Sequence, residues 1–504
     1  MTSFNLKSIF TKGDIISNRK AKGMIFMKYE RYVMGIDNGS QSTKVVLFDI
    51  EGNEVAFGSC PLRDPLTPEP GVVVHPDDDL WVSVYNAVED CLSNFKGNRQ
   101  AIEGIGLCTI RCCRVLLKQD GHLAYPVISW MDTRLSKPYK HEDDQVKYVT
   151  TTSGYLGFRM TGEFTDTAGN YEVNWPLDWE TLDWSKDDTV MEANGLRREM
   201  LFNLVKPGEK LGAIRSELAQ QLGLKEGIPV VATSNDKAVE VLGSGIKDKH
   251  SSMISLGTLI SSMIIRDDYF ENADKFFPTL AAIPFKYVYE SSGIRRGMWT
   301  VSWFKKLIGE ELVTNASSLE LSEEEFLNRK AEEVPVGSEG LITILDWLAS
   351  PSTPYRKGLM IGFDNRHTRY HIYRSILEAI AFNIKNNIDD MLYEVNTEIK
   401  HIVVTGGGSK SDVLMQILSD VFGLPVLRRK GSSSACLGAA ISVCNHLNIY
   451  EDFSEAIDRM VKTDVTFEPD ETNHAFYKEV NNTVVKHVRT HTDKILKLSY
   501  PIFQ

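Results

Sequence analysis

The sequence predicts an α/β protein whose two domains face each other across a central cleft, and three observations support this. The chain has 504 residues, more than one hydrophobic core usually supports, so two domains of similar size are expected. Residues 34–49 have the pattern of two strands joined by a short loop of Asp, Gly and hydroxyl residues. Residues 253–263 repeat this arrangement with a Gly-Thr turn. Two such hairpins on opposite sides of a cleft can bind one triphosphate from both sides.

The loop of the first hairpin has the chemistry of a phosphate-binding turn. Gly39 lets backbone N–H groups approach an anion, and the hydroxyls of Ser40, Ser42 and Thr43 can donate to phosphate oxygens. Asp37 suits a magnesium ion or its water. No helical pattern follows the loop, which excludes a P-loop, because that motif opens a helix. A tight hairpin whose polar residues only satisfy the turn is the structural alternative.

The other elements of the first half fit one mixed sheet and its helices. Residues 54–60 can form a third strand, and apolar residues recur at helical spacing after the three aspartates at 77–79, which suit the positive end of a helix. Residues 102–107 and 115–117 are expected as further strands of that sheet. Residues 229–233 are the expected strand before the polar segment Ser-Asn-Asp-Lys.

The domain junction is expected near residues 243–245, where glycines precede a charged run. This predicts an N-terminal extension over residues 1–30, an N-terminal domain over 31–246 with the first phosphate loop, and a C-terminal domain over 247–504 with the second. Residues 1–30 lack the continuous apolar core of a secretory signal and are expected to form a flexible extension.

A third glycine cluster, Gly406 to Gly408, follows an apolar strand pattern and precedes an amphipathic helix pattern. A flat adenosine can lie against a turn without side chains. A Rossmann dinucleotide site is disfavoured, because the GxGxxG spacing and the acidic residue about twenty positions later are both missing. The longer apolar stripe over residues 371–392 predicts a core helix.

Composition and charge restrict the partners and the compartment. The formal net charge of −12 argues against a nucleic-acid surface, which is normally basic. No apolar run is long enough to span a bilayer. The seven cysteines are an odd number without a CxxC pair, as expected for reduced thiols in the cytoplasm.

Asp236 follows the strand pattern at 229–233, and the carboxyl end of such a strand is the usual location of ligand chemistry in these sheets. A carboxylate there can accept the proton of an attacking hydroxyl during phosphoryl transfer. Its spacing alone favours a helix cap over a catalytic role. The two phosphate loops in the same chain favour the catalytic interpretation.

Taken in order, these segments resemble the FGGY family of carbohydrate kinases over residues 32–490, and within it bacterial sugar kinases of unassigned substrate. Glycerol kinase and xylulokinase are familiar members. The resemblance implies two ribonuclease-H-like domains, the actin-like ATPase architecture, which close around MgATP and a sugar or polyol. The matching segments are residues 35–44, 130–134, 161–164, 234–238, 255–258, 362–364, 374–382 and 406–408.

The resemblance also implies roles for individual residues. Asp236 matches the catalytic base, and Asp37 matches the aspartate that organises the metal. The positions expected to contact MgATP are Asp37, Gly39, Ser40, Gln41, Lys44, Gly257, Thr258, Gly406, Gly407, Gly408 and Ser411. The positions expected to contact the sugar are Arg111, Cys112, Trp130, Asp132 and Lys237.

Two departures from the family pattern prevent transfer of a known substrate. Glycerol kinases have an Arg-Glu pair and xylulokinases a His-Gly pair where this chain has Arg111 and Cys112. Lys237 stands where the glycerol enzymes have a substrate-binding Gln. A ligand with additional oxygens, such as an acidic or longer sugar, would suit this lysine.

The sequence therefore predicts a cytoplasmic enzyme that transfers the γ-phosphoryl group of MgATP to a hydroxyl of a small sugar or polyol. A homo-oligomer is compatible with it, whereas nucleic acid and membrane are not expected partners. Two alternatives stay open at this point. One is an actin-like ATPase that couples its nucleotide state to assembly, and the other is a sugar sensor without kinase activity.

Overall fold

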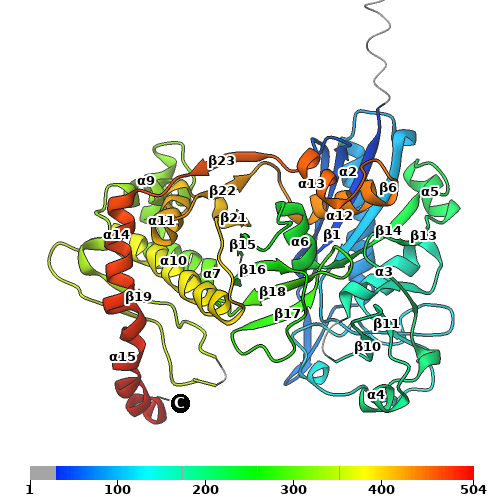
Figure 1. The fold of residues 1–504 in the computed structure, drawn as a ribbon, viewed down its shortest axis with the longest axis horizontal. Helices are drawn as coiled ribbons and strands as arrows, with labels where there is room; N and C mark the ends of the chain where they lie inside the picture. The colour runs from blue at the N-terminus through cyan, green and yellow to red at the C-terminus, as the bar shows by residue number, and fades with distance from the viewer. Residues whose placement is uncertain (1–29, 172–173, 258, 351, 504) are drawn as a thin grey trace, which may run out of the picture.

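The computed structural model of this protein describes residues 30–171, 174–257, 259–350 and 352–503. Two lobes, each built around a β-sheet, lie side by side (Figure 1). Except for Glu30, the extension predicted over residues 1–30 falls outside the described residues. Among the described residues, no helix combines the length and the hydropathy that crossing a membrane requires.

The first sheet has the strand order β13-β14-β6-β1-β2-β3. β1, β2 and β3 are antiparallel neighbours, whereas β6 runs parallel to β1 and β14 runs parallel to β6. The strands predicted over 54–60, 102–107 and 229–233 are confirmed within this sheet. The bounds are β1 Tyr32–Asn38, β2 Ser42–Asp49, β3 Glu54–Pro61, β6 Ile102–Thr109, β13 Lys210–Ala213 and β14 Pro229–Asn235.

The expectation that residues 115–117 extend this sheet is wrong. They form a strand, β7 (Val115–Leu117), which pairs with β8 (Tyr148–Thr150) in a separate two-stranded sheet. Between β6 and β7, Cys112 adopts a left-handed backbone conformation with φ of 59°. This turn directs the chain away from the first sheet after β6 ends.

The second sheet repeats the topology of the first. Its order is β17-β18-β16-β15-β21-β22-β23. β18, β16 and β15 are antiparallel neighbours, whereas β21 runs parallel to β15 and β22 runs parallel to β21. The first sheet has the same sequence of pairings from β3 to β14. The repeat that the sequence shows in two hairpins therefore extends over five strands of each sheet. The bounds are β15 Ser251–Leu256, β16 Ile260–Arg266, β17 Phe276–Leu280, β18 Tyr287–Ser291, β21 His401–Thr405, β22 Val426–Arg429 and β23 Thr463–Phe467.

Helices cover both sheets, and α10 confirms the core helix predicted over 371–392. The helices are α2 Asp79–Asn94, α3 Thr152–Thr161, α4 Asp188–Ala193, α5 Ser216–Leu222, α6 Asp236–Ser244, α7 Gly297–Ile308, α8 Glu310–Ser317, α9 Glu323–Glu332, α10 Arg369–Glu394, α11 Asp412–Phe422, α12 Ser434–His446, α13 Phe453–Met460, α14 Glu471–Val480 and α15 Lys486–Ser499. Short strands outside the two main sheets are β4 Leu66–Glu69, β5 Val72–Val74, β9 Thr165–Thr167, β10 Leu177–Asp178, β11 Asp183–Trp184, β12 Asn203–Val205, β19 Ile342–Ile344 and β20 Leu359–Ile361.

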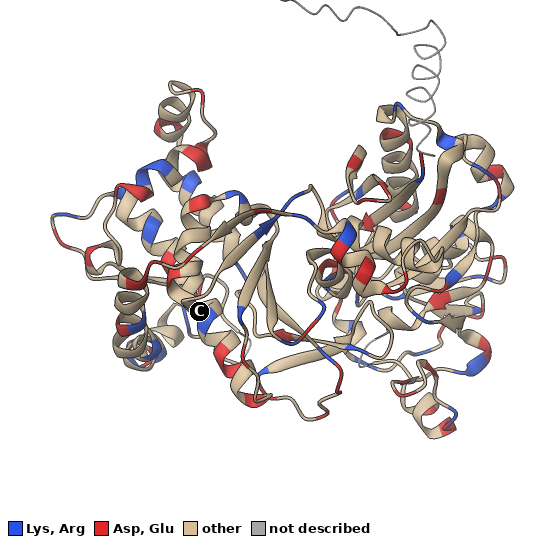
Figure 2. Ribbon diagram, turned by 45° about the horizontal axis from the view of Figure 1, so that its top comes forward, with Lys and Arg blue, Asp and Glu red and all other residues tan. Residues whose placement is uncertain are grey.

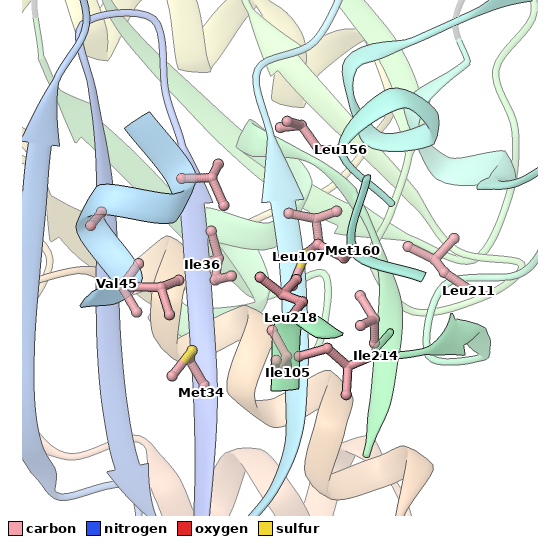
Figure 3. Close-up of a cluster of buried hydrophobic side chains, with 14 of the residues drawn as sticks. Met34, Ile36, Val45, Ile105, Leu107, Leu156, Met160, Leu211, Ile214 and Leu218 are labelled. Carbon is pink, nitrogen blue, oxygen red and sulfur yellow. The ribbon is translucent and has the colours of Figure 1, made fainter. Parts of the chain in front are cut away.

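The core of the first lobe lies between its sheet and the helices α2, α3 and α5. Met34 and Ile36 of β1 and Leu107 of β6 are at most 1% exposed, and they face the helices that cover this side of the sheet (Figure 3). Leu156 of α3 and Leu218 of α5 belong to the same cluster. Nearly every position of β1 and β6 is buried, because α12 and its neighbours cover the other face of the sheet, and such strands are near-continuous apolar runs in the sequence.

Helix α12 comes from the last quarter of the chain but packs on the first sheet, where Figure 1 shows it beside the blue strand β1. Glycines make this approach possible. A Cβ added at Gly35 of β1 would overlap the carbonyl oxygen of Cys436, and one at Gly106 of β6 would overlap that of Ala439. The second half of the chain is thereby anchored on the first sheet.

The two halves of the chain also meet at a second place, through a group of aromatic rings. Trp179 packs against Tyr269 and Tyr287 of the second half, with ring centroids 5.0 and 6.3 Å away. The buried cluster around these rings includes Trp184 of β11 and Tyr289 of β18. Elsewhere, acidic and basic positions are interspersed over both lobes (Figure 2).

Candidate active site

A cavity of about 930 Å³ lies between the two sheets, a volume typical of nucleotide-sized ligands. Four segments supply most of its lining: the β1–β2 hairpin, the start of α6, the turn after β21 and the loop between β22 and α12. These segments are far apart in the sequence and converge because each follows a strand end in one of the two sheets. Of the residues predicted for ligand binding or catalysis, the cavity is lined by Asp37, Gly39, Ser40, Lys44, Asp236, Lys237, Gly406 and Gly407.

Other predicted ATP contacts lie near the cavity without lining it. Gln41 is exposed on the first hairpin. A Cβ added at Gly408 would press on Leu256, so this glycine permits close packing of the turn against β15. Ser411 caps α11 by accepting a hydrogen bond from the Leu414 N–H at 3.3 Å. Gly257 belongs to the turn after β15, and the predicted contact Thr258 falls outside the described residues.

Asp37 stands at the end of β1, where its cross-strand partner is Lys44 of β2. Burial raises the pKa of Asp37 to about 7, and the carboxylates of Asp236 and Glu240 act in the same direction against the opposing charge of Lys44. Several carboxylates that share a buried site resist simultaneous ionisation. Their oxygen atoms are the donors that a hard divalent cation prefers.

Glu240 of α6 is the centre of a hydrogen-bonded group at the cavity wall. Its carboxylate accepts from Lys237 Nζ at 3.0 Å, from Ser255 Oγ at 3.0 Å and from Thr405 Oγ1 at 2.6 Å. Lys237 Nζ also donates to Ser255 Oγ at 3.1 Å. The lysine that the sequence assigns to the sugar is therefore directed toward Glu240 and β15.

Asp236 occupies the first turn of α6, but the helix cap is its neighbour Asn235, whose side chain accepts from the Ala238 N–H at 3.0 Å. The Asp236 carboxylate faces the cavity and lies 3.8 Å from Arg111 Nε. Burial raises the pKa of Asp236, and the positive charge of Arg111 opposes this rise. Arg111 itself lies 2.6 Å from Glu290 Oε2 of β18, so it connects the carboxylate with the second sheet.

A second, smaller cavity of about 250 Å³ is lined by the loop that follows Arg111. Cys112, which directly follows Arg111, lines it together with residues of both halves of the chain. Trp130 is 52% exposed and lines neither cavity. Asp132 is buried and lines neither cavity; its carboxylate binds Arg134 at 2.7 Å and accepts from the Val73 N–H at 2.8 Å.

Comparison with known proteins agrees with this architecture. A family model described as the N-terminal domain of the FGGY family of carbohydrate kinases matches residues 32–141 and 135–243, and the model of the C-terminal domain matches residues 253–444. The chain belongs to the FGGY family of carbohydrate kinases. This confirms the family and the kinase function that the sequence predicts, and it favours them over the actin-like ATPase and the sugar sensor.

Individual FGGY relatives extend over nearly the whole chain. The Escherichia coli (strain K12) protein named "Uncharacterized sugar kinase YgcE" is 46% identical over 473 residues, which cover 94% of this chain and 96% of that protein. Xylulose kinase of Bacillus subtilis (strain 168) is 25% identical, with coverage of 92% and 97%. The crystal structure of gluconate kinase from Lactobacillus acidophilus has a TM-score of 0.78 at 20% identity and covers 92% of this chain and 98% of its own. These matches confirm the predicted two-domain fold class.

Several residues that line the large cavity of this FGGY kinase are absent from the sequence-based prediction. Glu240 and Thr405 carry no local motif, so their role depends on the packing of α6 against the second sheet. For the loop 431–434, the sequence does contain a pattern that could have predicted anion binding. The basic run 428–430 is followed by Gly-Ser-Ser-Ser at the start of α12, and helix N-termini with exposed N–H groups are typical anion-binding positions.

Proposed function

We propose that the protein transfers the γ-phosphoryl group of ATP to a hydroxyl of a small sugar or polyol, with Asp236 as the base. The position of Asp236 carries this proposal. Its carboxylate lines the large cavity and lies 3.8 Å from Arg111, whose neighbour Cys112 lines the small cavity. A nucleotide in one cavity and a sugar in the other would both reach this carboxylate.

Cationic and side-chain-free groups of the large cavity suit a triphosphate. Lys44 and Arg429 line it. Arg429 donates a hydrogen bond to the Ser244 carbonyl at 2.8 Å. Burial lowers the pKa of the Arg429 guanidinium. Gly406 and Gly407 form the wall after β21, and a Cβ added at Gly407 would meet nothing within 4 Å. This open turn supports the proposed adenosine position.

The donor set beside Asp37 fits Mg²⁺, which proteins bind through one or two carboxylates together with substrate phosphates. We propose that Asp37 holds it, because a bound cation would favour the ionised carboxylate, which the burial of this group disfavours. When bound, Mg²⁺ neutralises charge that develops on the transferred phosphoryl group.

In the proposed reaction, the hydroxyl proton of the sugar moves to an Asp236 carboxylate oxygen while the hydroxyl oxygen forms a bond to the γ-phosphorus and ADP leaves. Burial strengthens Asp236 as a base by raising its pKa. Arg111 orients the carboxylate and joins it to Glu290 of the second sheet. Water competes with the sugar as acceptor, so closure of the two halves around the site protects the reaction.

An ADP-release screen with ketoses, polyols and sugar acids tests the proposal. With an active sugar, Asp236→Asn should lower kcat by about 10²- to 10⁴-fold, the usual contribution of a general base, and keep the ATP affinity. Asp144→Asn, an exposed aspartate outside both cavities, is the matched control. Sugar phosphorylation by Asp236→Asn at the wild-type rate would overturn the assignment.

We propose the domain division at residues 31–246 and 247–504. The end of α6 at Ser244 and the start of β15 at Ser251 support it. For the compartment, the odd number of seven cysteines without a CxxC pair supports the proposed cytoplasmic location.

A further inference from the structure

The small cavity contains a buried arginine without a counter-charge. Arg114 is 5% exposed and lines this cavity, three residues after Arg111. Its guanidinium lies over the rings of Tyr139 and Trp175, with 5.8 and 5.6 Å to the ring centroids. Within the described part of the chain its side chain makes no ion pair, and its Nε has no hydrogen-bond partner.

This arrangement is energetically unusual. A buried charge is strongly disfavoured unless it is paired, and aromatic faces compensate for part of the cost. The neighbouring acid Asp132 is occupied by Arg134 and by the Val73 N–H. Burial lowers the pKa of the Arg114 guanidinium, and the nearby charge of Asp132 offsets this effect only in part. A charge that the fold leaves uncompensated is available to a ligand.

The rest of the cavity has the character of a sugar site. Its volume of about 250 Å³ equals the space of roughly eight water molecules, which suits a small sugar and excludes a nucleotide. Asn170 donates its amide hydrogens to Thr109, Thr151 and Ser153, while its buried Oδ1 has no partner in the described chain. This oxygen can accept a hydrogen bond from a sugar hydroxyl.

The loop that lines the cavity also carries the arginine beside the proposed base. Cys112, Cys113 and Arg114 line the cavity and directly follow Arg111 in the sequence. Arg111 joins the same loop to Asp236 at 3.8 Å. One ligand can therefore have one end at Arg114 and a hydroxyl near Asp236.

We propose that the acceptor of this kinase is a sugar acid whose carboxylate binds Arg114 in the small cavity while a hydroxyl at its other end reaches Asp236. The inference rests on the proposed function and specifies its substrate class. A guanidinium fork matches a carboxylate in a bidentate pair. One unpaired cation balances one negative charge, which favours a carboxylate over a phosphate ester, since the latter carries about −1.5 to −2 at neutral pH. Arg114, instead of Lys237, then recognises the acid, because Lys237 is bound to Glu240 and Ser255.

The test compares matched substrates in the ADP-release assay: gluconate against glucitol, and xylonate against xylitol. We expect the wild-type kcat/KM to be at least about tenfold higher for the acid of the preferred pair. Arg114→Met should raise KM for that acid about 10- to 100-fold while kcat changes by less than about threefold, because a charged hydrogen-bonded contact is lost. Arg114→Lys should recover part of the affinity.

Two controls separate binding from folding. Arg197→Met removes an exposed arginine that pairs with Glu199 two residues later, and it should leave the KM for the acid unchanged. Arg114→Met should also unfold at the same temperature as the wild type or a higher one, since the variant no longer buries an unpaired charge. A lower unfolding temperature together with equal losses for acid and alditol would overturn the inference, because it would make Arg114 structural.

The outcomes distinguish this inference from the proposed function. If alditols are phosphorylated as well as the acids, and Arg114→Met affects both equally, the inference fails and the kinase function stands. If no substrate releases ADP, the proposed function fails, and calorimetric titration with gluconate and xylonate decides the inference. Binding that Arg114→Met abolishes would support it, and no binding to the wild type would overturn it.

Discussion

Glu240 accepts a hydrogen bond from Thr405 Oγ1 at 2.6 Å, although 165 residues separate the two. The same carboxylate binds Ser255 of β15 and Lys237 of its own helix. Helix α6, which carries Asp236 at its start, is thereby fixed to two neighbouring strands of the second sheet. The wall of the large cavity is thus built from both halves of the chain.

This relationship predicts a pH-dependent loss of stability in Glu240→Gln. Burial acts to raise the pKa of Glu240, but the Lys237 charge and the hydrogen bonds from Thr405, Lys237 and Ser255 outweigh it and lower the pKa below its usual 4.5. The ionised carboxylate therefore contributes stability above pH 4.5, and this contribution is lost as the pH falls through the folded-state pKa. At pH 7 the variant should unfold with a free energy about 1–3 kcal/mol lower than the wild type.

Urea unfolding of both proteins at neutral pH and at acidic pH, below the folded-state pKa of Glu240, measures this difference. The difference in the free energy of unfolding between the wild type and Glu240→Gln should be smaller at the lower pH. Glu333→Gln is the matched control, because this glutamate pairs with Lys330 at the surface and its side chain is 65% exposed. A gap of constant size across the pH range would show that the charge of Glu240 does not stabilise the junction.

Local chemistry explains which parts of the site the sequence predicts. The strand hairpins predicted at 34–49 and 253–263 and the glycine turn at 406–408 are each contained in a short segment, so their residue types identify them without tertiary information. Asp236 is also recognisable, because it follows a strand end. For these elements the structure adds position: Asp37, Asp236 and Gly407 line one cavity.

The parts that the sequence does not predict depend on contacts between distant segments. Nothing near Ser434 indicates that α12 will pack on β1 and β6, since this contact relies on Gly35 and Gly106 far earlier in the chain. Arg114 is similar: in the sequence it is one of two nearby arginines, and its burial follows from Tyr139 and Trp175, which cover it. Periodicity and spacing carry no information about such packing.

The crossing of α6 and α12 predicts a large effect of Gly243→Ala. A Cβ at Gly243 would overlap the Ser434 carbonyl oxygen and lie 2.6 Å from the Gly438 nitrogen, so the helices would have to separate. Overpacking of this kind usually costs about 1–3 kcal/mol. We expect a lower unfolding midpoint in urea and, because α12 joins the two halves, a lower kcat as well. An unchanged midpoint would mean that α12 shifts without cost.

Gly407→Ala should leave the stability unchanged and weaken the binding of ATP. A Cβ at Gly407 would meet no atom within 4 Å, so the urea midpoint should equal that of the wild type, which makes this variant the stability control for Gly243→Ala. The new methyl group would, however, project into the cavity beside the proposed adenosine position. We expect the Kd for ATP to rise about tenfold, which corresponds to about 1.4 kcal/mol. Calorimetric titration with ATP measures it, and wild-type affinity in this variant would locate the adenosine away from the turn after β21.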